Sequence, residues 1–166
     1  MLETIVLIIN IVLLLYLIIS GRKDERKTFK VKLDDYGSKL KHAHTTDAGY
    51  DIVTPFEKTI PARGSVVIDT GVHVLIPEGY VGILKSKSGL NIKHGIISTG
   101  VVDAGYTGSI VVKLYNLSDE DYTFSGGDKI TQIVFFPIEC IDDEIVYVDE
   151  FDETERGDNG FGSSGR

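Results

Sequence analysis

Short runs of β-branched and aromatic residues, separated by glycine, proline and aspartate, follow one another through most of this chain. From residue 65 onward they read SVVIDTGVHVLI, YVGIL, SIVVKLYNL, YTFS, KITQIVFFPI and EIVYV. The segments between them contain turn-forming sequences such as PEG, AGYTG and SGGD, and almost nothing here has a helical period. This alternation of short strands and tight turns predicts an all-β barrel or jelly roll.

One of these runs, SIVVKLYN at 109–116, alternates only partly between apolar and polar residues. A strand with one solvent-facing side would show a clean alternation, so we expect both faces of this strand to be covered. The pattern therefore indicates an interface between subunits.

An apolar segment precedes the predicted β domain. Residues 5–19 read IVLIINIVLLLYLII, and with the flanking residues they approach the roughly 20 residues that cross a bilayer as a helix. A secretory signal peptide is the alternative, but it needs positive charge before the apolar run, where only Glu3 is charged. We interpret 1–20 as a transmembrane anchor that contacts the lipid bilayer through 2–20, and 21–30 as a charged linker. The basic residues after the span predict a cytoplasmic location for the domain that follows.

The charge of the chain restricts its partners. Of its 17 basic and 25 acidic side chains, four and three lie in residues 1–27, which leaves 13 and 22 in residues 28–166. A net charge of about −9 disfavours nonspecific nucleic-acid binding, which depends on lysine and arginine neutralising phosphates, so we expect none. The single Cys140 excludes an internal disulfide, which is typical of a reducing compartment, and its apolar neighbours favour a buried thiol.

Five glycine-flanked polar clusters carry the candidate chemistry. They are TDAGYD at 46–51, KSKSGL at 85–90, GVVDAGYTG at 100–108, GDKITQ at 127–132 and RGDNGFGSSGR at 156–166. The second cluster offers two ammonium groups, two hydroxyls and a glycine N–H, which together are the donors of a phosphate site. An exposed turn with solvated lysines is the alternative. The fifth has the composition of a disordered tail, but it also holds two arginines and an aromatic ring, which a linker does not need.

Carboxylates in two of the clusters are candidates for catalysis and metal binding. Asp103 is expected at a strand end that enters a tight hairpin, where it could act as general base toward water, and Tyr106 could lie against a sugar or base. Asp51 could support a hydrated Mg²⁺, which takes few protein carboxylates. An ordinary turn aspartate is the alternative in both cases. Gln132, amid apolar residues of a predicted strand, would need hydrogen-bond partners if it pointed inward.

Three other motifs carry weaker signals. His42 and His44 could ligate a transition metal together with Asp47, but no third histidine or cysteine lies near them in the sequence. His94 is more typical of a packing or hydrogen-bonding residue than of a catalytic one. The RGD sequence at 156–158 resembles an adhesion motif, which a cytoplasmic tail without a signal peptide disfavours.

In this order the five clusters closely resemble the conserved blocks of the homotrimeric dUTPase family, over residues 28–166, and the second and third are most similar to the phage and Gram-positive branch. The resemblance implies a distorted jelly-roll (β-clip) subunit over 31–150 and a homotrimer in which each active site draws blocks from all three chains. It also implies hydrolysis of dUTP to dUMP and pyrophosphate with Mg²⁺ as cofactor, and a flexible C-terminal lid arm over 151–166.

The resemblance also implies roles for single residues. Asp103 would orient and deprotonate the water that attacks the α-phosphorus, and Tyr106 would pack on the deoxyribose and exclude a 2′-hydroxyl. The hairpin backbone, including Val102, would read the uracil edge, and Phe161 would cover the uracil. Asp51 would support the water shell of the metal. The residues expected to contact the phosphates are Lys87, Ser88, Gly89, Gln132, Arg156, Gly162, Ser163 and Ser164.

This chain departs from the family pattern at two places. Lys87 stands where the second block usually has arginine, which keeps the charge but loses the planar bidentate fork. The N-terminal span is the second departure. Two alternatives to a dUTPase remain. A dCTP deaminase, which shares the fold, would need a glutamate on the strand at 109–113, where there is no acid. A membrane-tethered regulator would act through a protein partner, although retention of Asp103 argues against lost catalysis.

Overall fold

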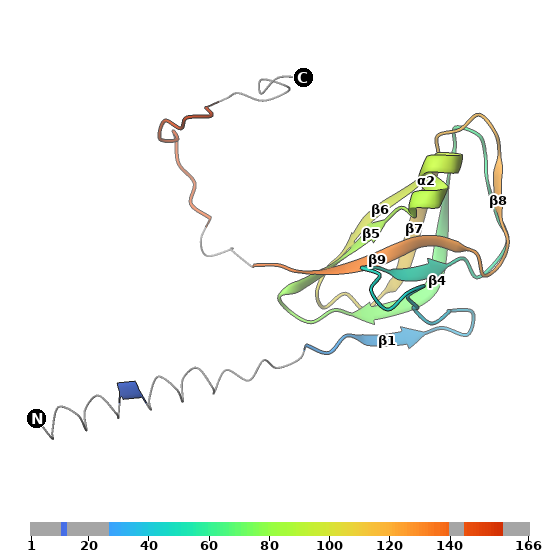
Figure 1. Cartoon of the computed structure of the whole chain (residues 1–166), viewed down its shortest axis with the longest axis horizontal. Coiled ribbons are helices and arrows are strands. Elements are labelled where there is room, and N and C mark those ends of the chain that lie inside the picture. The colour runs from blue at the N-terminus through green and yellow to red at the C-terminus, as the bar shows by residue number, and fades with distance from the viewer. Residues whose placement is uncertain (1–10, 13–26, 140–144, 158–166) are drawn as a thin grey trace, which may run out of the picture.

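The computed structural model describes residues 11–12, 27–139 and 145–157 (Figure 1). The domain formed by the described residues is mostly β, as the sequence predicts. Its elements are β1 (Lys30–Leu33), β2 (Tyr50–Val53), β3 (Lys58–Ile60), β4 (Ser65–Leu75), β5 (Tyr80–Lys85), α2 (Ser88–His94), β6 (Ile96–Val102), β7 (Ser109–Asn116), β8 (Tyr122–Phe124) and β9 (Lys129–Pro137).

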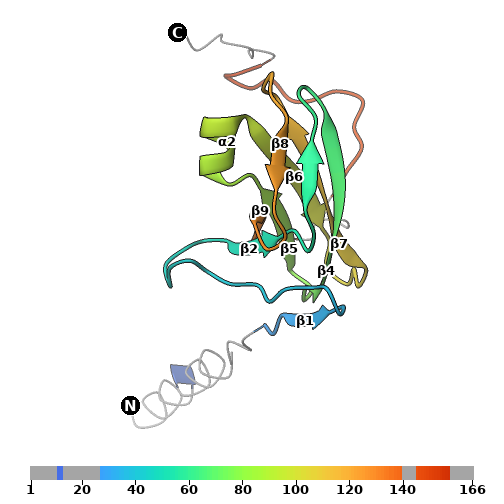
Figure 2. The ribbon, with the colours of Figure 1, turned by 90° about the vertical axis from the view of Figure 1, so that its right-hand side faces the viewer.

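Seven of the strands form one curled antiparallel sheet in the order β1-β4-β7-β6-β5-β9-β2 (Figure 1). Strand β6 joins the two halves of this sheet, because its residues 96–98 pair with β7 and its residues 99–102 pair with β5. Strands β3 and β8 form a separate two-stranded sheet. Ile60 of β3 and Phe124 of β8 belong to the same buried core as the large sheet, so the small sheet packs against the large one (Figure 2).

Burial alternates strictly along β7. Ile110, Val112 and Leu114 are buried in the core, whereas Val111 and Tyr115 point outward and are exposed. The sequence hides this alternation because two of its outward positions are themselves apolar. Among the described residues of one chain, only one face of β7 is covered and the outward face carries exposed apolar side chains, so the covering of that face by another subunit stays a prediction.

Strand β4 contains a bulge that the sequence pattern does not reveal. Asp69 lies opposite Val111 and His73 lies opposite Ser109, so three residues of β4 face a single residue of β7. Gly71, at the centre of the bulge, has a φ of +63°, and a Cβ there would lie 2.6 Å from the ring of Tyr36. Glycine is therefore required at this point. The bulge sets His73 at the base of the hairpin between β6 and β7.

Two further features differ from the sequence predictions. Residues 88–94 form a helix, which ends at Gly95 in a left-handed conformation (φ +64°). The sequence does not reveal this helix because seven residues are too few to display a helical period. Ile145–Val148, predicted as a strand, form none, and their side chains are exposed. A strand is stable only beside a pairing partner, and no other described segment of the chain pairs with this one.

The N-terminal part of the chain is only partly described. No helix among the described residues is long and apolar enough to cross a membrane. The predicted anchor, apart from Ile11 and Val12, lies outside the described residues, as does Cys140. The folded domain includes Phe29, whose ring centroid lies 4.6 Å from that of Phe135, so the domain begins within the segment interpreted as a linker.

Candidate active site

Three of the five polar clusters converge around Gln132. Strand β9 lies between β2 and β5, and Gln132 is paired with Asp51 on one side and with Lys85 on the other. The side-chain amide of Gln132 donates a hydrogen bond to the Ser86 carbonyl at 3.4 Å. Its side-chain oxygen lies where a Cβ on Gly49 would approach within 2.5 Å, so the glycine of the first cluster leaves room for the amide.

Asp51 is the charged centre of this convergence. The side chain is 7% exposed and its carboxylate is paired with the ammonium groups of Lys87 and Lys129, the latter at 2.6 Å. Burial raises the pKa of Asp51, but the interactions with Lys129 and Lys87 together lower it by more than burial raises it. The pKa of Asp51 therefore lies below its ordinary value of 3.8. Lys87, predicted as a phosphate ligand, is therefore paired with the Asp51 carboxylate.

A cleft of about 350 Å³ opens beside Asp51. Its lining residues are Ser38, Lys39, Lys41, Asp51, Val53, Gly127 and Lys129. Three of these are lysines, and Lys87 adds a fourth cation on the Asp51 carboxylate. In a domain of net negative charge, this is a local concentration of positive charge of the kind that an anionic ligand needs.

Ser88 and Gly89 begin α2, directly after Lys87. Both residues are exposed, and the first turn of the helix contains no acidic side chain. A Cβ built on Gly89 would meet nothing within 4 Å, so packing within the chain does not require a glycine there. The exposed backbone at the start of α2 is accessible to an oxyanion that approaches closely.

The third cluster forms the hairpin between β6 and β7. Asp103 directly follows β6, as the sequence predicts, and it is exposed, while Val102 is buried beneath it. The Tyr106 N–H donates to the Asp103 carbonyl at 3.3 Å, and Gly105 has a φ of +78°. The ring of Tyr106 covers Gly108, where a Cβ would lie 2.2 Å from the phenol oxygen, and its hydroxyl donates to the Ser109 carbonyl at 3.1 Å. The turn therefore fixes both Asp103 and Tyr106.

One chain does not bring the third cluster to the other three. In the β5–β6 pair, Lys85 lies opposite Thr99, and Gly82 lies opposite Val102. Asp103 lies just past the end of the pair that contains Val102, whereas Lys87 lies just past the other end, which contains Lys85. The hairpin and the lysine cleft are therefore at opposite ends of two adjacent strands.

The fifth cluster is described only in part. Arg156 lies in an exposed turn, in which the Gly157 N–H donates to the Thr154 carbonyl at 3.1 Å. The predicted ligands Phe161, Gly162, Ser163 and Ser164 lie outside the described residues.

The described residues contain no group of three or more histidine, cysteine, aspartate or glutamate side chains that could hold a metal. His42 stacks on Tyr50 with ring centroids 3.8 Å apart, and His44 is exposed beside Asp47, so neither residue supports the zinc alternative. Asp51 is a single carboxylate between two lysines. This donor set fits an ion that arrives on the phosphates of a substrate and keeps its own waters, because Mg²⁺ needs only one or two protein carboxylates.

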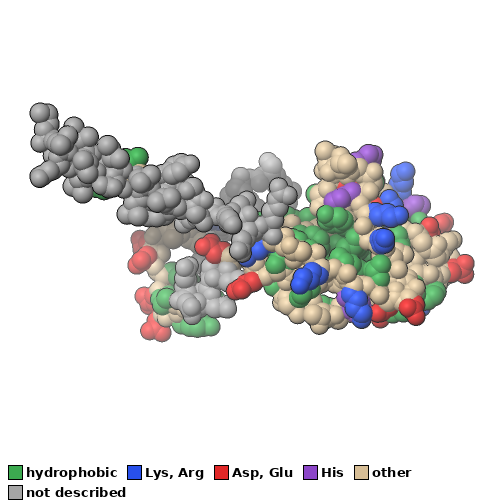
Figure 3. Space-filling view, turned by 90° about the horizontal axis from the view of Figure 1, so that it is seen from below, with side chains coloured by type: hydrophobic (Ala, Val, Ile, Leu, Met, Phe, Trp, Pro, Cys, Tyr) green, Lys and Arg blue, Asp and Glu red, His purple; other side chains and the backbone are tan. Residues whose placement is uncertain are grey.

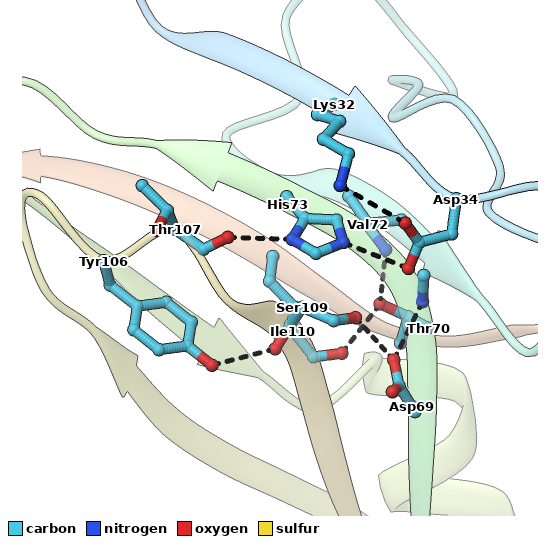
Figure 4. A network of polar contacts seen from close by, with 11 residues as sticks. Lys32, Asp34, Asp69, Thr70, Val72, His73, Tyr106, Thr107, Ser109 and Ile110 are labelled. Atoms are coloured by element: carbon cyan, nitrogen blue, oxygen red, sulfur yellow. Dashed lines mark hydrogen bonds and ion pairs between the residues drawn. The ribbon is translucent and has the colours of Figure 1, made fainter.

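One polar network beside the hairpin is not evident from the sequence. Figure 4 shows His73 between the Thr107 carbonyl and the Asp34 carboxylate, with Asp69 and Ser109 next to it. A histidine within the apolar run SVVIDTGVHVLI was a possible signal, but its partners come from distant parts of the chain.

We expect Asp51→Asn to lower the free energy of unfolding by about 1–3 kcal/mol at neutral pH, since the partly buried Lys87 and the exposed Lys129 lose their counter-charge. The folded-state pKa of Asp51 is depressed, so its contribution is present above the unfolded pKa of 3.8 and is lost as pH falls through the folded value. When the pH is lowered below 3.8, the free energy of unfolding should therefore fall less in the variant than in the natural chain. Urea unfolding at fixed protein concentration, followed by circular dichroism across this range, measures both effects. Equal acid sensitivity of the two chains would contradict the charge pairing.

This chain is similar to known dUTPases in sequence over most of its length. A dUTPase family model matches residues 35–165. The deoxyuridine 5′-triphosphate nucleotidohydrolase of Kluyveromyces lactis is 40% identical over 141 residues, which cover 84% of this chain and 95% of that protein. The corresponding protein of Arabidopsis thaliana is 38% identical over 149 residues, which cover 89% of both.

Solved structures show the same likeness. The dUTPase of Staphylococcus bacteriophage 80alpha with dUPNHPP is 34% identical with a TM-score of 0.74, over 84% of this chain and 99% of that one. A mutant dUTPase of phage phi11, described as coordinating a structural Mg(II) ion, is 32% identical with a TM-score of 0.67, over 76% and 99%. The fungal and plant relatives are at least as similar as the phage enzymes, so these comparisons do not single out the phage branch. The chain belongs to the dUTPase family.

Proposed function

We propose that this chain is a dUTP diphosphatase, which hydrolyses dUTP to dUMP and pyrophosphate, limits uracil in DNA and supplies dUMP for dTMP synthesis. The convergence of the first, second and fourth family blocks around Gln132 is the observation that carries the proposal. Membership of the dUTPase family also supports the proposal, because relatives at about 40% identity are named deoxyuridine 5′-triphosphate nucleotidohydrolases.

In the proposed reaction Asp103 is the general base. Its carboxylate orients a water molecule and accepts its proton as the water oxygen bonds to the α-phosphorus and the bond to the bridging oxygen of pyrophosphate breaks. Lys87, Ser88, Gly89 and Gln132 bind the phosphates, and Tyr106 packs on the deoxyribose. Mg²⁺ bound to the triphosphate, with its water shell supported by Asp51, would offset the charge of the phosphate chain.

We propose further that the active site is shared between the chains of a homotrimer. The separation of Asp103 from the lysine cleft supports this, because another copy can supply the missing hairpin. Exposed apolar side chains on the outward face of β4 and β7, namely Val67, Val111 and Tyr115, also support it. Figure 3 shows a face of the domain on which hydrophobic side chains gather, with lysine and histidine side chains around them.

A nucleotide panel tests the proposed activity. The full chain with Mg²⁺ and dUTP, dCTP, dTTP or UTP should release pyrophosphate from dUTP far faster than from the other three. Ammonia release from dCTP would instead support the deaminase alternative, although Ser109–Lys113 at the start of β7 contain no acid. Binding of a protein partner without hydrolysis of dUTP would support the regulator alternative.

Residues 2–20 are proposed to anchor the chain in a membrane, with the enzyme domain on the cytoplasmic side. The apolar length of this segment predicts that the full chain stays with the membrane pellet after carbonate extraction. A variant that lacks residues 2–20 should move to the supernatant while it keeps dUTP hydrolysis, because it keeps Phe29, the first described residue that packs against the core of the domain. Full-length protein in the supernatant would contradict the anchor.

A further inference from the structure

His73 connects the active-site hairpin to the N-terminal edge of the sheet. Its Nδ1 lies 2.8 Å from the Thr107 carbonyl oxygen, and its Nε2 lies 3.1 Å from Oδ2 of Asp34 (Figure 4). Thr107 belongs to the hairpin that carries Asp103 and Tyr106. Asp34 follows β1, and its own N–H donates to the Gly71 carbonyl of the β4 bulge at 2.9 Å. The side chain of His73 is 16% exposed, so solvent reaches little of it.

Both partners of the ring are hydrogen-bond acceptors. A carbonyl oxygen cannot donate, and an ionised carboxylate cannot donate either, so both contacts are satisfied only when both ring nitrogens carry hydrogen. This is the imidazolium form of histidine. A neutral ring satisfies one partner and turns a bare nitrogen lone pair toward the other.

The surrounding charges favour the imidazolium. The hydrogen bond to Thr107, followed by the hydrogen bond to Asp34, raises the pKa of His73 above its ordinary value of 6.5. The hydrogen bond from His73 lowers the pKa of Asp34. Lys32 of β1, 3.6 Å from Asp34, opposes protonation of the ring, whereas the charge of Asp69 on β4 supports it. Tyr36, which follows β1, lies beside Asp69. The hairpin residues next to His73 and Asp69 are Thr107 and Ser109, which carry no charge.

We propose that His73 is a positioning residue, whose protonated ring ties the Thr107 carbonyl to Asp34 and so holds the hairpin in the conformation that receives deoxyuridine. The inference rests on the proposed function, because it takes the hairpin as the part that reads the sugar and base. The β4 bulge makes this tie possible, since it brings His73 opposite Ser109. The buried Thr70 holds the bulge from the other side, because its hydroxyl donates to the Ile110 carbonyl at 2.7 Å.

The tie predicts a pH dependence of substrate binding. Because the pKa of His73 is raised in the folded chain, the contribution of the protonated ring is complete below pH 6.5 and is lost as pH rises through the folded value. Loss of one hydrogen bond increases the population of displaced hairpin conformations, and KM for dUTP rises. The kcat of correctly bound substrate changes little, because His73 does not touch the reacting atoms.

Two substitutions at His73 separate positioning from general stability. In His73→Asn the carboxamide nitrogen can take the place of Nδ1, so it donates to Thr107 but does not titrate. His73→Ala removes both contacts. His94→Asn is the matched control, because His94 lies at the end of α2, away from the hairpin, and packs against Tyr122 with ring centroids 4.7 Å apart. Thermal unfolding of all four chains monitors stability separately.

The measurement is KM and kcat for dUTP, with Mg²⁺, at several pH values from about 6 to about 9, around the range in which histidine titrates. We expect KM of the natural chain and of His94→Asn to rise roughly five-fold over this range, as loss of one hydrogen bond predicts. KM of His73→Asn should stay nearly flat, and KM of His73→Ala should be high throughout. The proposal is overturned if His73→Asn follows the pH profile of the natural chain, or if His73→Ala has normal KM at low pH.

An NMR titration of the histidine side chains keeps the inference separate from the proposed function. His73 should titrate above pH 6.5, and Asp34→Asn should lower its pKa. If the natural chain hydrolyses no dUTP while His73 titrates as expected, the proposed function fails and the tie remains. If the chain hydrolyses dUTP and His73 titrates at or below pH 6.5, the tie is wrong.

Discussion

Asp103→Asn is expected to lower kcat for dUTP by about 10³-fold, while KM changes little. The carboxylate is the one acidic side chain of the hairpin at 103–108, and the amide that replaces it cannot accept a proton from water. The substitution leaves the hairpin in place, because the turn uses the backbone carbonyl of Asp103 and not its side chain. Steady-state release of pyrophosphate, together with equilibrium binding of a non-hydrolysable dUTP analogue, separates lost chemistry from lost binding.

Asp119→Asn is the matched control for this substitution. Asp119 also lies in an exposed turn, but after the far end of β7, where its carboxylate pairs with Arg63 at 2.7 Å. An exposed ion pair contributes little to stability, so this variant should keep both kcat and KM. Near-normal turnover of Asp103→Asn would show that another group is the general base.

The sequence reveals the parts of the site whose chemistry is local. Asp103 is recognisable because an apolar strand precedes it and a glycine-containing turn follows it, and the structure places it at the end of β6 as expected. The convergence at Gln132 needs more information, because it depends on β9 lying between β2 and β5. Strand order is set by pairing between distant segments, which periodicity does not encode.

The network around His73 also depends on pairing between distant segments, so the sequence pattern does not predict it. Its members come from β1, β4 and the β6–β7 hairpin, and the register that joins them depends on the bulge at Gly71. In the sequence, Gly71 is one of 18 glycines, and nothing local distinguishes it from the others. The close approach of Tyr36 identifies it, and that contact exists only once the chain is folded.

Deletion of residues 155–166 is expected to lower kcat/KM for dUTP by about 10²-fold or more. The deleted segment contains Arg156, the predicted γ-phosphate ligand, and Phe161, the predicted cover of the uracil. The described β domain ends at β9, before this segment, so we expect unchanged thermal unfolding and an unchanged mass of the proposed trimer by light scattering. Normal activity of the shortened chain would exclude the lid role.

Co-expression of the two inactive chains tests whether one active site draws on several copies. The Asp103→Asn chain keeps its C-terminal arm, and the chain without 155–166 keeps Asp103. If each site takes its hairpin and its arm from different chains, mixed trimers contain some sites with both parts intact, and activity returns. Differently tagged chains allow the mixed trimers to be purified before they are assayed. The proposed sharing of each active site among the chains of a trimer predicts this recovery, and the separation of Asp103 from the lysine cleft within a single chain supports that sharing. Mixed trimers as inactive as their parents would show that each chain supplies both the hairpin and the arm of its own site.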